Sequence, residues 1–151
     1  MNLFDEFFAI VRELQMNGVK YAVVGGIAMA FHDQPRFTRD IDILVAPRDR
    51  RKLQAVLEHL GYFEGSKPWM FKKGSLSLHR FVKTQKEDFL VVDVLFGSTH
   101  RLKQVIENAV EQPWAAGVVR VARKTDIVWM KKLRASEQDL VDIGRLKRDK
   151  D

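Results

Sequence analysis

Residues 21–45 of the chain read YAVVGGIAMAFHDQPRFTRDIDILV. Tyr21–Val24 is apolar throughout and predicts a short buried strand. Gly25-Gly26 predicts a tight turn into a small-residue helix over Ile27–His32. A second strand over Asp40–Ala46 follows and opens with two acids separated by an isoleucine. The segment therefore predicts strand, glycine turn, helix and strand in close succession, with carboxylates at the start of the second strand.

The rest of the chain continues the mixture of helices and strands. Ser98 is expected to cap the helix that begins near residue 100, and Thr125 the one that begins at Asp126. We expect an α/β (α+β) fold with a mixed sheet flanked by helices. No repeat or linker interrupts the chain, so we expect one domain over 1–151. The predicted helices cover 2–16, 48–60, 100–110 and, in two pieces, about 126–146, and the predicted strands cover 69–72, 76–82, 89–96 and 118–121.

Composition narrows the range of partners. The 151 residues carry a net charge of +6 and no cysteine, which excludes disulfides and thiolate metal sites. No apolar run approaches the roughly 18 residues that a membrane-spanning helix needs. We therefore expect a cytoplasmic protein without a membrane partner. The excess of positive charge suits a polyanionic partner such as a nucleic acid.

Much of that positive charge lies in one segment, Lys67–Lys86. It contains six Lys or Arg residues and no acid, and it includes Trp69, Phe71 and Phe81. One interpretation is a surface that holds a nucleic-acid backbone and stacks a base. The other is an ordinary sheet with a solvated basic face and its aromatic side chains in the core. The sequence leaves both open.

Three carboxylates carry the chemistry. Asp40 and Asp42 are two apart on a predicted strand and so share one face, and Asp93 interrupts the apolar run FLVVDVLFG. A buried charge is costly unless something compensates it. If the three lie about 5 Å apart, each pair repels by roughly 3 kcal/mol at an effective dielectric of about 20. Hard divalent cations remove that repulsion, and oxygen ligands suit Mg²⁺ or Mn²⁺.

The glycine pair adds a possible phosphate site. Glycine allows the backbone to approach a ligand closely, and a strand that leads directly into a helix directs N–H groups at one point. A triphosphate would fit there. Taken alone, a Gly-Gly turn is more often only a turn.

Together these motifs resemble the nucleotidyltransferase superfamily that includes the catalytic domain of DNA polymerase β. Val24-Gly25-Gly26 is followed after thirteen residues by Asp40-Ile41-Asp42-Ile43, and Val92-Asp93-Val94 lies on a later strand. A narrower resemblance is to the small bacterial nucleotidyltransferases of the AbiEii toxin type. Its motifs are Arg36-Phe37-Thr38-Arg39-Asp40-Ile41-Asp42, then Met130-Lys131, then Gln138-Asp139-Leu140-Val141-Asp142-Ile143.

The resemblance implies a role for each matching residue. Asp40, Asp42 and Asp93 would be both metal ligands and catalytic residues, with Asp93 also helping to deprotonate the acceptor hydroxyl. The nucleotide would be bound by Gly25, Gly26, Arg36, Thr38 and Lys131. Many relatives have an arginine three residues before the acid that corresponds to Asp139, where this chain has Ser136. Larger relatives also have a C-terminal helical domain, so either this domain or a partner protein would recognise the acceptor.

We therefore expect an enzyme that transfers a nucleoside monophosphate from an NTP to a hydroxyl and releases pyrophosphate. The acceptor is expected to be the 3′ end of tRNA or another RNA, with a protein hydroxyl as the second choice. A small polycationic antibiotic is third, because the sequence shows no acidic patch outside the three aspartates. The alternative from another class is a non-catalytic module that binds RNA or protein on the same fold. The choice of NTP stays open.

Overall fold

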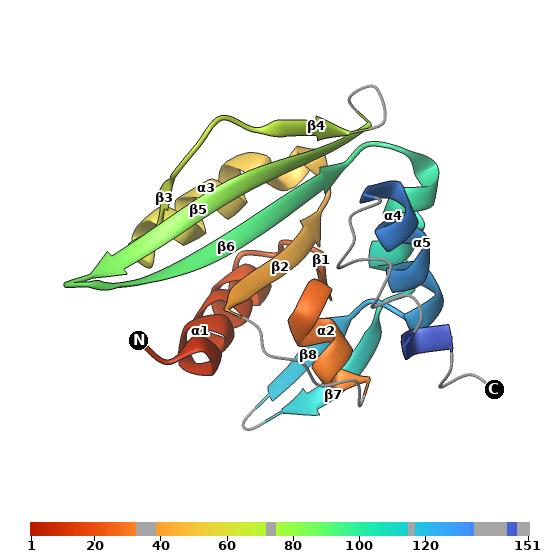
Figure 1. The fold of residues 1–151 in the computed structure, drawn as a ribbon, viewed down its shortest axis with the longest axis horizontal. Helices are drawn as coiled ribbons and strands as arrows, with labels where there is room; N and C mark the ends of the chain where they lie inside the picture. Colours follow the sequence, from red (N-terminus) through yellow and green to blue (C-terminus); the bar gives the residue numbers. More distant parts are fainter. Residues whose placement is uncertain (33–38, 72–74, 115–116, 135–144, 148–151) are drawn as a thin grey trace.

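The structure is a computed structural model that describes residues 1–32, 39–71, 75–114, 117–134 and 145–147. Its strands form one mixed sheet of eight strands in the order β3-β5-β6-β2-β1-β8-β7, and β4 pairs with β5 (Figure 1). The strands are β1 (Tyr21–Val24), β2 (Asp40–Val45), β3 (Phe63–Glu64), β4 (Trp69–Phe71), β5 (Leu76–Gln85), β6 (Asp88–Gly97), β7 (Val110–Trp114) and β8 (Gly117–Val121).

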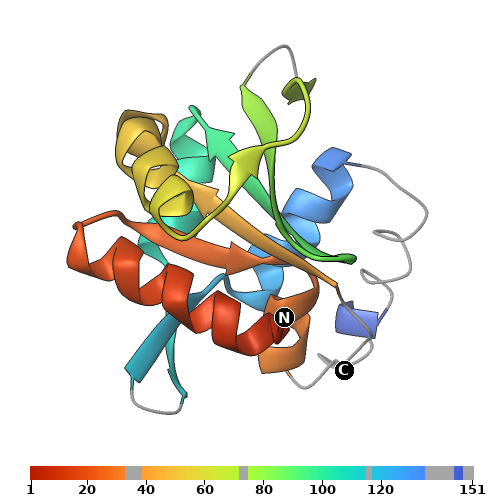
Figure 2. The same cartoon turned by 90° about the vertical axis from the view of Figure 1, so that its left-hand side faces the viewer.

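Helices lie on both sides of this sheet. α1 and α3 cover one face, and α5 lies on the other (Figures 1 and 2). Ile41, Ile43 and Val45 of β2 are completely buried, as expected for the apolar side of an alternating strand. The helices are α1 (Leu3–Met16), α2 (Gly25–Phe31), α3 (Arg50–His59), which follows the 3-10 turn η1 (Pro47–Asp49), α4 (His100–Glu107) and α5 (Lys124–Arg134).

Strand register sets the positions of the functional side chains. β2 and β6 are parallel, and Asp42 is the register partner of Asp93. β5 is antiparallel to β6 and places Arg80 opposite Asp93. β1 is antiparallel to β2 and ends with Val24 opposite Asp42, directly before Gly25. Cross-strand partners project from the same face, so this register brings four segments that are distant in sequence to one place.

The predicted α/β architecture is confirmed, with corrections at element ends. α2 begins at Gly25 rather than at Ile27, and α4 ends at Glu107. α5 begins at Lys124, so Thr125 lies within the helix and the prediction that it caps a helix beginning at Asp126 is wrong. The expected cap by Ser98 is wrong: Thr99 accepts the hydrogen bond from the Leu102 N–H, whereas the Ser98 hydroxyl donates to the Ser75 carbonyl. Most of the final segment expected up to residue 146 lies outside the described residues.

Two strands were not predicted, for different reasons. β3 has two residues, too few for an alternating pattern. β7 is an edge strand that contains Pro113, and proline is tolerated at an edge because one row of N–H groups has no ladder partner there. No helix in the described part of the chain is both long enough and apolar enough to cross a membrane.

Candidate active site

The acid row, which we define as Asp40, Asp42 and Asp93, lies on the face of the sheet that α5 covers. Leu95, two residues after Asp93, lines a small pocket together with Ile127, Met130 and Lys131 of α5, which identifies the face. Asp42 is 8% and Asp93 3% exposed, whereas Asp40, at the start of β2, is partly exposed. Two of the three carboxylates are therefore buried beside each other on adjacent strands.

Gly25 makes room for one of these carboxylates. Its φ is +70°, a conformation that disfavours residues with a Cβ. A Cβ placed on Gly25 would lie 2.3 Å from Oδ2 of Asp42, well inside van der Waals contact. Any larger residue would therefore displace the Asp42 carboxylate. Besides turning the chain, Gly25 therefore leaves space for an acid beside the backbone, which the sequence did not indicate.

Arg80 is the site residue that sequence reasoning missed. Its Nε donates to Oδ1 of Asp93 at 2.8 Å, and its second terminal nitrogen donates to Oδ2 at 3.0 Å. The pKa of Arg80 is raised, chiefly by this hydrogen bonding, with smaller contributions from the charges of Asp40 and Asp42. One guanidinium thus interacts with the whole acid row. From the sequence Arg80 was only one basic residue in a basic strand. The β5–β6 register was needed to show that it pairs with Asp93.

Lys131 is brought to the glycine turn. It is 5% exposed and lines the small pocket together with Val24 and Gly25. A buried lysine beside a glycine turn and an acid row is suited to binding an anionic ligand. Gly26 is also buried at the start of α2. Arg36 and Thr38, also predicted to bind the nucleotide, lie outside the described residues.

The basic segment divides between the two faces of the sheet. Phe81 is 3% exposed and belongs to the core, and Lys83 pairs with Glu6 at 2.7 Å on the side of α1. Trp69 is 44% exposed, and its ring lies 5.2 Å from the Arg80 guanidinium carbon. Alternation therefore places part of the segment in the core, as the ordinary-sheet interpretation expected, and part of it beside the acid row.

The donor set fits a hard divalent cation. All three acids offer carboxylate oxygens on one face, and Gly25 lacks the Cβ that would displace one of them. In the arrangement that the described residues adopt, no three acidic or histidine side chains are positioned to hold a metal ion. Both oxygens of Asp93 accept hydrogen bonds from Arg80. Asp40 and Asp42 are therefore the better-placed ligands, and Arg80 would compete with a metal for the oxygens of Asp93.

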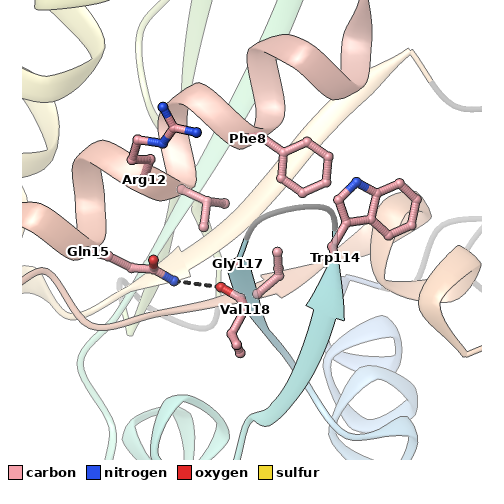
Figure 3. Close-up of a pocket in the computed structure, with 8 residues that line it drawn as sticks. Phe8, Arg12, Gln15, Trp114, Gly117 and Val118 are labelled. Atoms are coloured by element: carbon pink, nitrogen blue, oxygen red, sulfur yellow. Dashed lines mark hydrogen bonds between the residues drawn. The ribbon is translucent and has the colours of Figure 1, made fainter.

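A separate pocket of about 280 Å³ lies between α1 and the β7–β8 hairpin (Figure 3). It is lined mainly by apolar and aromatic side chains, including Phe8 and Trp114, and the Gln15 amide donates to the Val118 carbonyl at 2.8 Å. Arg12 is its one charged lining residue. Because the described residues that line this pocket include no carboxylate and no acid–base pair, their chemistry does not support catalysis, and we assign the candidate site to the acid row.

Comparisons with known proteins identify the family of the chain. The family model described as "Nucleotidyl transferase AbiEii toxin, Type IV TA system" matches residues 13–150. That range includes the glycine turn, all three acids, Arg80 and Lys131. No curated protein sequence is similar enough to match the chain.

Several solved structures share the fold at low sequence identity. The antibiotic-resistance enzyme ANT(2″)-Ia, in complex with adenylyl-2″-tobramycin, is 16% identical with a TM-score of 0.60, over 93% of this chain and 84% of that one. The lincosamide adenylyltransferase LnuA, with lincomycin bound, is 18% identical with a TM-score of 0.58, over 95% of each chain. A protein from Thermotoga maritima, described as a candidate nucleotidyltransferase, is 13% identical with a TM-score of 0.58, over 97% of this chain and 88% of that one. These likenesses concern the fold.

Proposed function

The chain belongs to the AbiEii family of nucleotidyltransferases, and on that premise we propose that it transfers a nucleoside monophosphate from an NTP to a hydroxyl of an RNA, in a reaction that depends on a divalent metal ion. The observation that carries the proposal is the register of β2 and β6, which places Asp42 beside Asp93 on the face where Gly25 and Lys131 meet. Nucleotidyl transfer uses metal-binding carboxylates beside the phosphates of the donor, and this register supports such a site.

The reaction exchanges one bond to phosphorus for another. The oxygen of the acceptor hydroxyl attacks the α-phosphorus of the NTP, the bond from that phosphorus to the bridging oxygen of the β-phosphate breaks, and pyrophosphate leaves. We assign the proton of the hydroxyl to Asp93. Each of its oxygens already accepts one hydrogen bond from Arg80, and each has a second lone pair that can accept another.

Mg²⁺ or Mn²⁺ would be held by Asp40 and Asp42, with Asp93 as a third ligand. When bound, the ion neutralises phosphate charge and makes the acceptor hydroxyl easier to deprotonate. The protein's own part is to hold these carboxylates in place. The Asp42 side chain is fixed against Gly25, and Arg80 fixes the orientation of Asp93.

Lys131 and the glycine turn are proposed to hold the triphosphate. Lys131 reaches this turn from α5, across the pocket that it shares with Gly25. Arg36 and Thr38 are proposed to contribute from the segment between α2 and β2. We further propose that residues 1–151 act as one domain in the cytoplasm, where NTPs are available.

RNA is the acceptor that the charge favours. The net charge of +6 suits a polyanion, whereas an enzyme for a polycationic antibiotic would need acids beyond those that hold the metal. The antibiotic-modifying enzymes that share the fold are less than 20% identical to this chain, so they do not decide the acceptor. A hydroxyl on a partner protein is the second candidate, because the AbiEii family description names a toxin–antitoxin system.

A label-transfer assay tests the proposal. Purified protein and Mg²⁺ are incubated with each α-labelled NTP and either deproteinised cellular RNA or nuclease-treated protein extract, with the Asp40→Ala/Asp42→Ala double variant as control. We expect label in a nuclease-sensitive product made only by the wild type, and the best NTP identifies the donor. Label only in a protease-sensitive product would replace RNA with a protein acceptor. Equal labelling by the double variant would contradict the role of the acid row.

A further inference from the structure

Beyond the acid row, the same face of the sheet continues into a surface with exposed aromatic side chains. β5 and β6 pair without a bulge, so residues 89, 91, 93 and 95 of β6 share one face with residues 78, 80, 82 and 84 of β5. Trp69 of β4 is opposite Leu78, and Phe63 of β3 is opposite Val82. Phe63, Trp69 and Phe89 are 52%, 44% and 55% exposed. We call these three residues the aromatic strip.

The strip lies where the described helices leave the sheet open. In Figure 1 the face with the acid row is turned toward the reader, α2 and α5 lie at the centre and right, and no described helix is drawn in front of β3, β4 or the left-hand parts of β5 and β6. Single exposed aromatic residues need no explanation, but these three surround Asp93 on one face, each roughly 12–13 Å from it by strand register. Other exposed aromatic side chains are packed among themselves: Trp114 stacks on Phe4 and Phe8 with ring centroids 5.6 and 5.3 Å apart.

Arginines accompany two of the three rings. The Arg80 guanidinium carbon lies 5.2 Å from the Trp69 ring centroid, and that of Arg39 lies 6.0 Å from the Phe89 centroid. Arg80 also binds Asp93, so the position of Trp69 is linked to the catalytic acid through one guanidinium. Exposed rings beside arginines are the combination that holds single-stranded nucleic acid, because the rings stack on bases and the cations attract the backbone.

The order of residues across the sheet separates the two substrates. Lys131 and Gly25 lie on the β1 side of the acid row, whereas Arg80 and Trp69 lie on the β5 and β4 side. Neighbouring strands are about 4.8 Å apart and residues about 3.3 Å apart along a strand, so Trp69, two strands across and two residues along, lies roughly 12 Å from Asp93. If the triphosphate lies at Gly25, the acceptor must approach from the opposite side of the acids, which is where the aromatic strip lies.

We infer that the aromatic strip is the acceptor platform: bases at the single-stranded end of an RNA stack on Trp69 and Phe89, and this stacking presents the terminal hydroxyl to Asp93. The inference rests on the proposed function, since it places the acceptor of that reaction. In this inference Trp69 is a positioning residue, because it contacts a base of the acceptor RNA rather than the reacting atoms. Single-stranded RNA is favoured over a protein because arginines lie beside two of the rings and would attract the RNA backbone.

The test measures RNA binding without NTP or metal. A fluorescein-labelled single-stranded RNA of twelve nucleotides is titrated with the full chain at physiological salt, and binding is followed by anisotropy. Losing one base–aromatic stack weakens binding roughly 5-fold to 100-fold, and we expect this for Trp69→Leu and for Phe89→Leu. Trp69→Phe keeps a ring and should stay within about 3-fold of wild type.

Met70→Ala is the matched control. Met70 adjoins Trp69 on β4 and is 64% exposed, but its register partner is Ser77, on the opposite face. We expect it to bind the RNA as tightly as wild type. The same RNA annealed to its complement should bind more weakly, because its bases are no longer available. Wild-type affinity in Trp69→Leu, or equal affinity for the duplex, would overturn the platform and leave only general charge attraction.

This measurement separates the inference from the proposed function. The Asp40→Ala/Asp42→Ala variant should still bind the RNA and respond to Trp69→Leu, although it transfers nothing. If the wild type binds RNA through the strip but labels no RNA, the RNA-transferase proposal fails and the platform stands. If the wild type labels RNA and Trp69→Leu raises neither the KM for RNA nor the dissociation constant, the platform fails. A raised KM for NTP alone would assign Trp69 to the donor base and would also overturn it.

Discussion

Two buried aspartates, Asp93 and Asp126, have similar surroundings, but we propose a catalytic role for Asp93 and a structural one for Asp126. Asp93 is 3% exposed and accepts two hydrogen bonds from Arg80, and Arg80 lies over Trp69. Asp126, in the first turn of α5, is completely buried and is held by Arg101 at 2.7 Å and Arg123 at 3.0 Å. Arg101 in turn lies 4.3 Å from the ring of Trp129. The combination of buried aspartate, arginine and tryptophan therefore occurs twice.

The ratio of charges separates the two sites. At Asp126 two guanidinium groups share one carboxylate, so the cluster has an excess of positive charge and the acid is satisfied within the fold. At the acid row Arg80 pairs with Asp93, and two further acids, Asp40 and Asp42, lie on the same face. Three carboxylates on one face repel one another and favour the binding of a cation, whereas one carboxylate held by two guanidinium groups does not. The neighbouring acids, rather than burial or pairing, distinguish the proposed active site from the Asp126 cluster.

The largest expected effect distinguishes the two aspartate sites by activity. Asp42→Asn should lower nucleotidyl transfer on the order of 1,000-fold, as for loss of one preorganised electrostatic group from a catalytic site. It should leave the metal-free protein as stable as the wild type or slightly more stable, because it relieves repulsion in the acid row. Label transfer and thermal melts without metal would check the two effects.

Asp126→Asn is the matched control for this experiment. It should keep transfer and lose about 2 kcal/mol of stability, because charged hydrogen bonds to a buried acid are lost. The comparison would be broken if Asp42→Asn unfolded the metal-free protein as readily as Asp126→Asn does, since the acid row would then be structural.

The second-largest expected effect comes from comparing alanine substitutions at two glycines, Gly25 beside the acid row and Gly18 away from it. Gly25 and Gly18 have nearly the same backbone conformation, φ +70° and φ +69°, but a Cβ on Gly18 would meet nothing within 4 Å. Both alanine variants should lose about 1–2 kcal/mol from the left-handed backbone. Only Gly25→Ala should also lose transfer, because its Cβ displaces the Asp42 carboxylate. Urea denaturation and the label assay measure the two losses, and equal activity of the two variants would show that Asp42 needs no fixed position.

The smallest expected effect concerns Arg80, whose guanidinium pairs with Asp93 in the acid row. Arg80→Gln should lower metal-free stability by about 1 kcal/mol, a reduced value because the Arg80 side chain is 40% exposed. Without Arg80 the acid row should bind Mg²⁺ more tightly, so the increase in Tm on adding Mg²⁺ should exceed that of the wild type. Arg101→Gln should lower stability without changing the response to Mg²⁺. Equal Mg²⁺ responses in the two variants would mean that Arg80 does not compete with a metal.

The sequence by itself determined the architecture and the identity of the acids. Alternation in Asp40–Val45 predicted which side chains enter the core, a local feature that depends on strand period. The order of glycine turn, paired acids and later acid resembles that of nucleotidyltransferases, and this resemblance indicated the family. The edge strand β7 and the two-residue β3 were missed because neither has a period that local pattern can reveal.

Only the tertiary structure decided what each acid contacts. The pairing of Arg80 with Asp93 depends on the β5–β6 register, the contact of Gly25 with Asp42 on the end of β1, and the approach of Lys131 on the packing of α5. The same register divided the basic segment, placing Phe81 in the core and Trp69 beside the acid row. The physical reason is that contacts between residues far apart in the chain follow from strand pairing and packing, and a single sequence encodes these only through the whole fold.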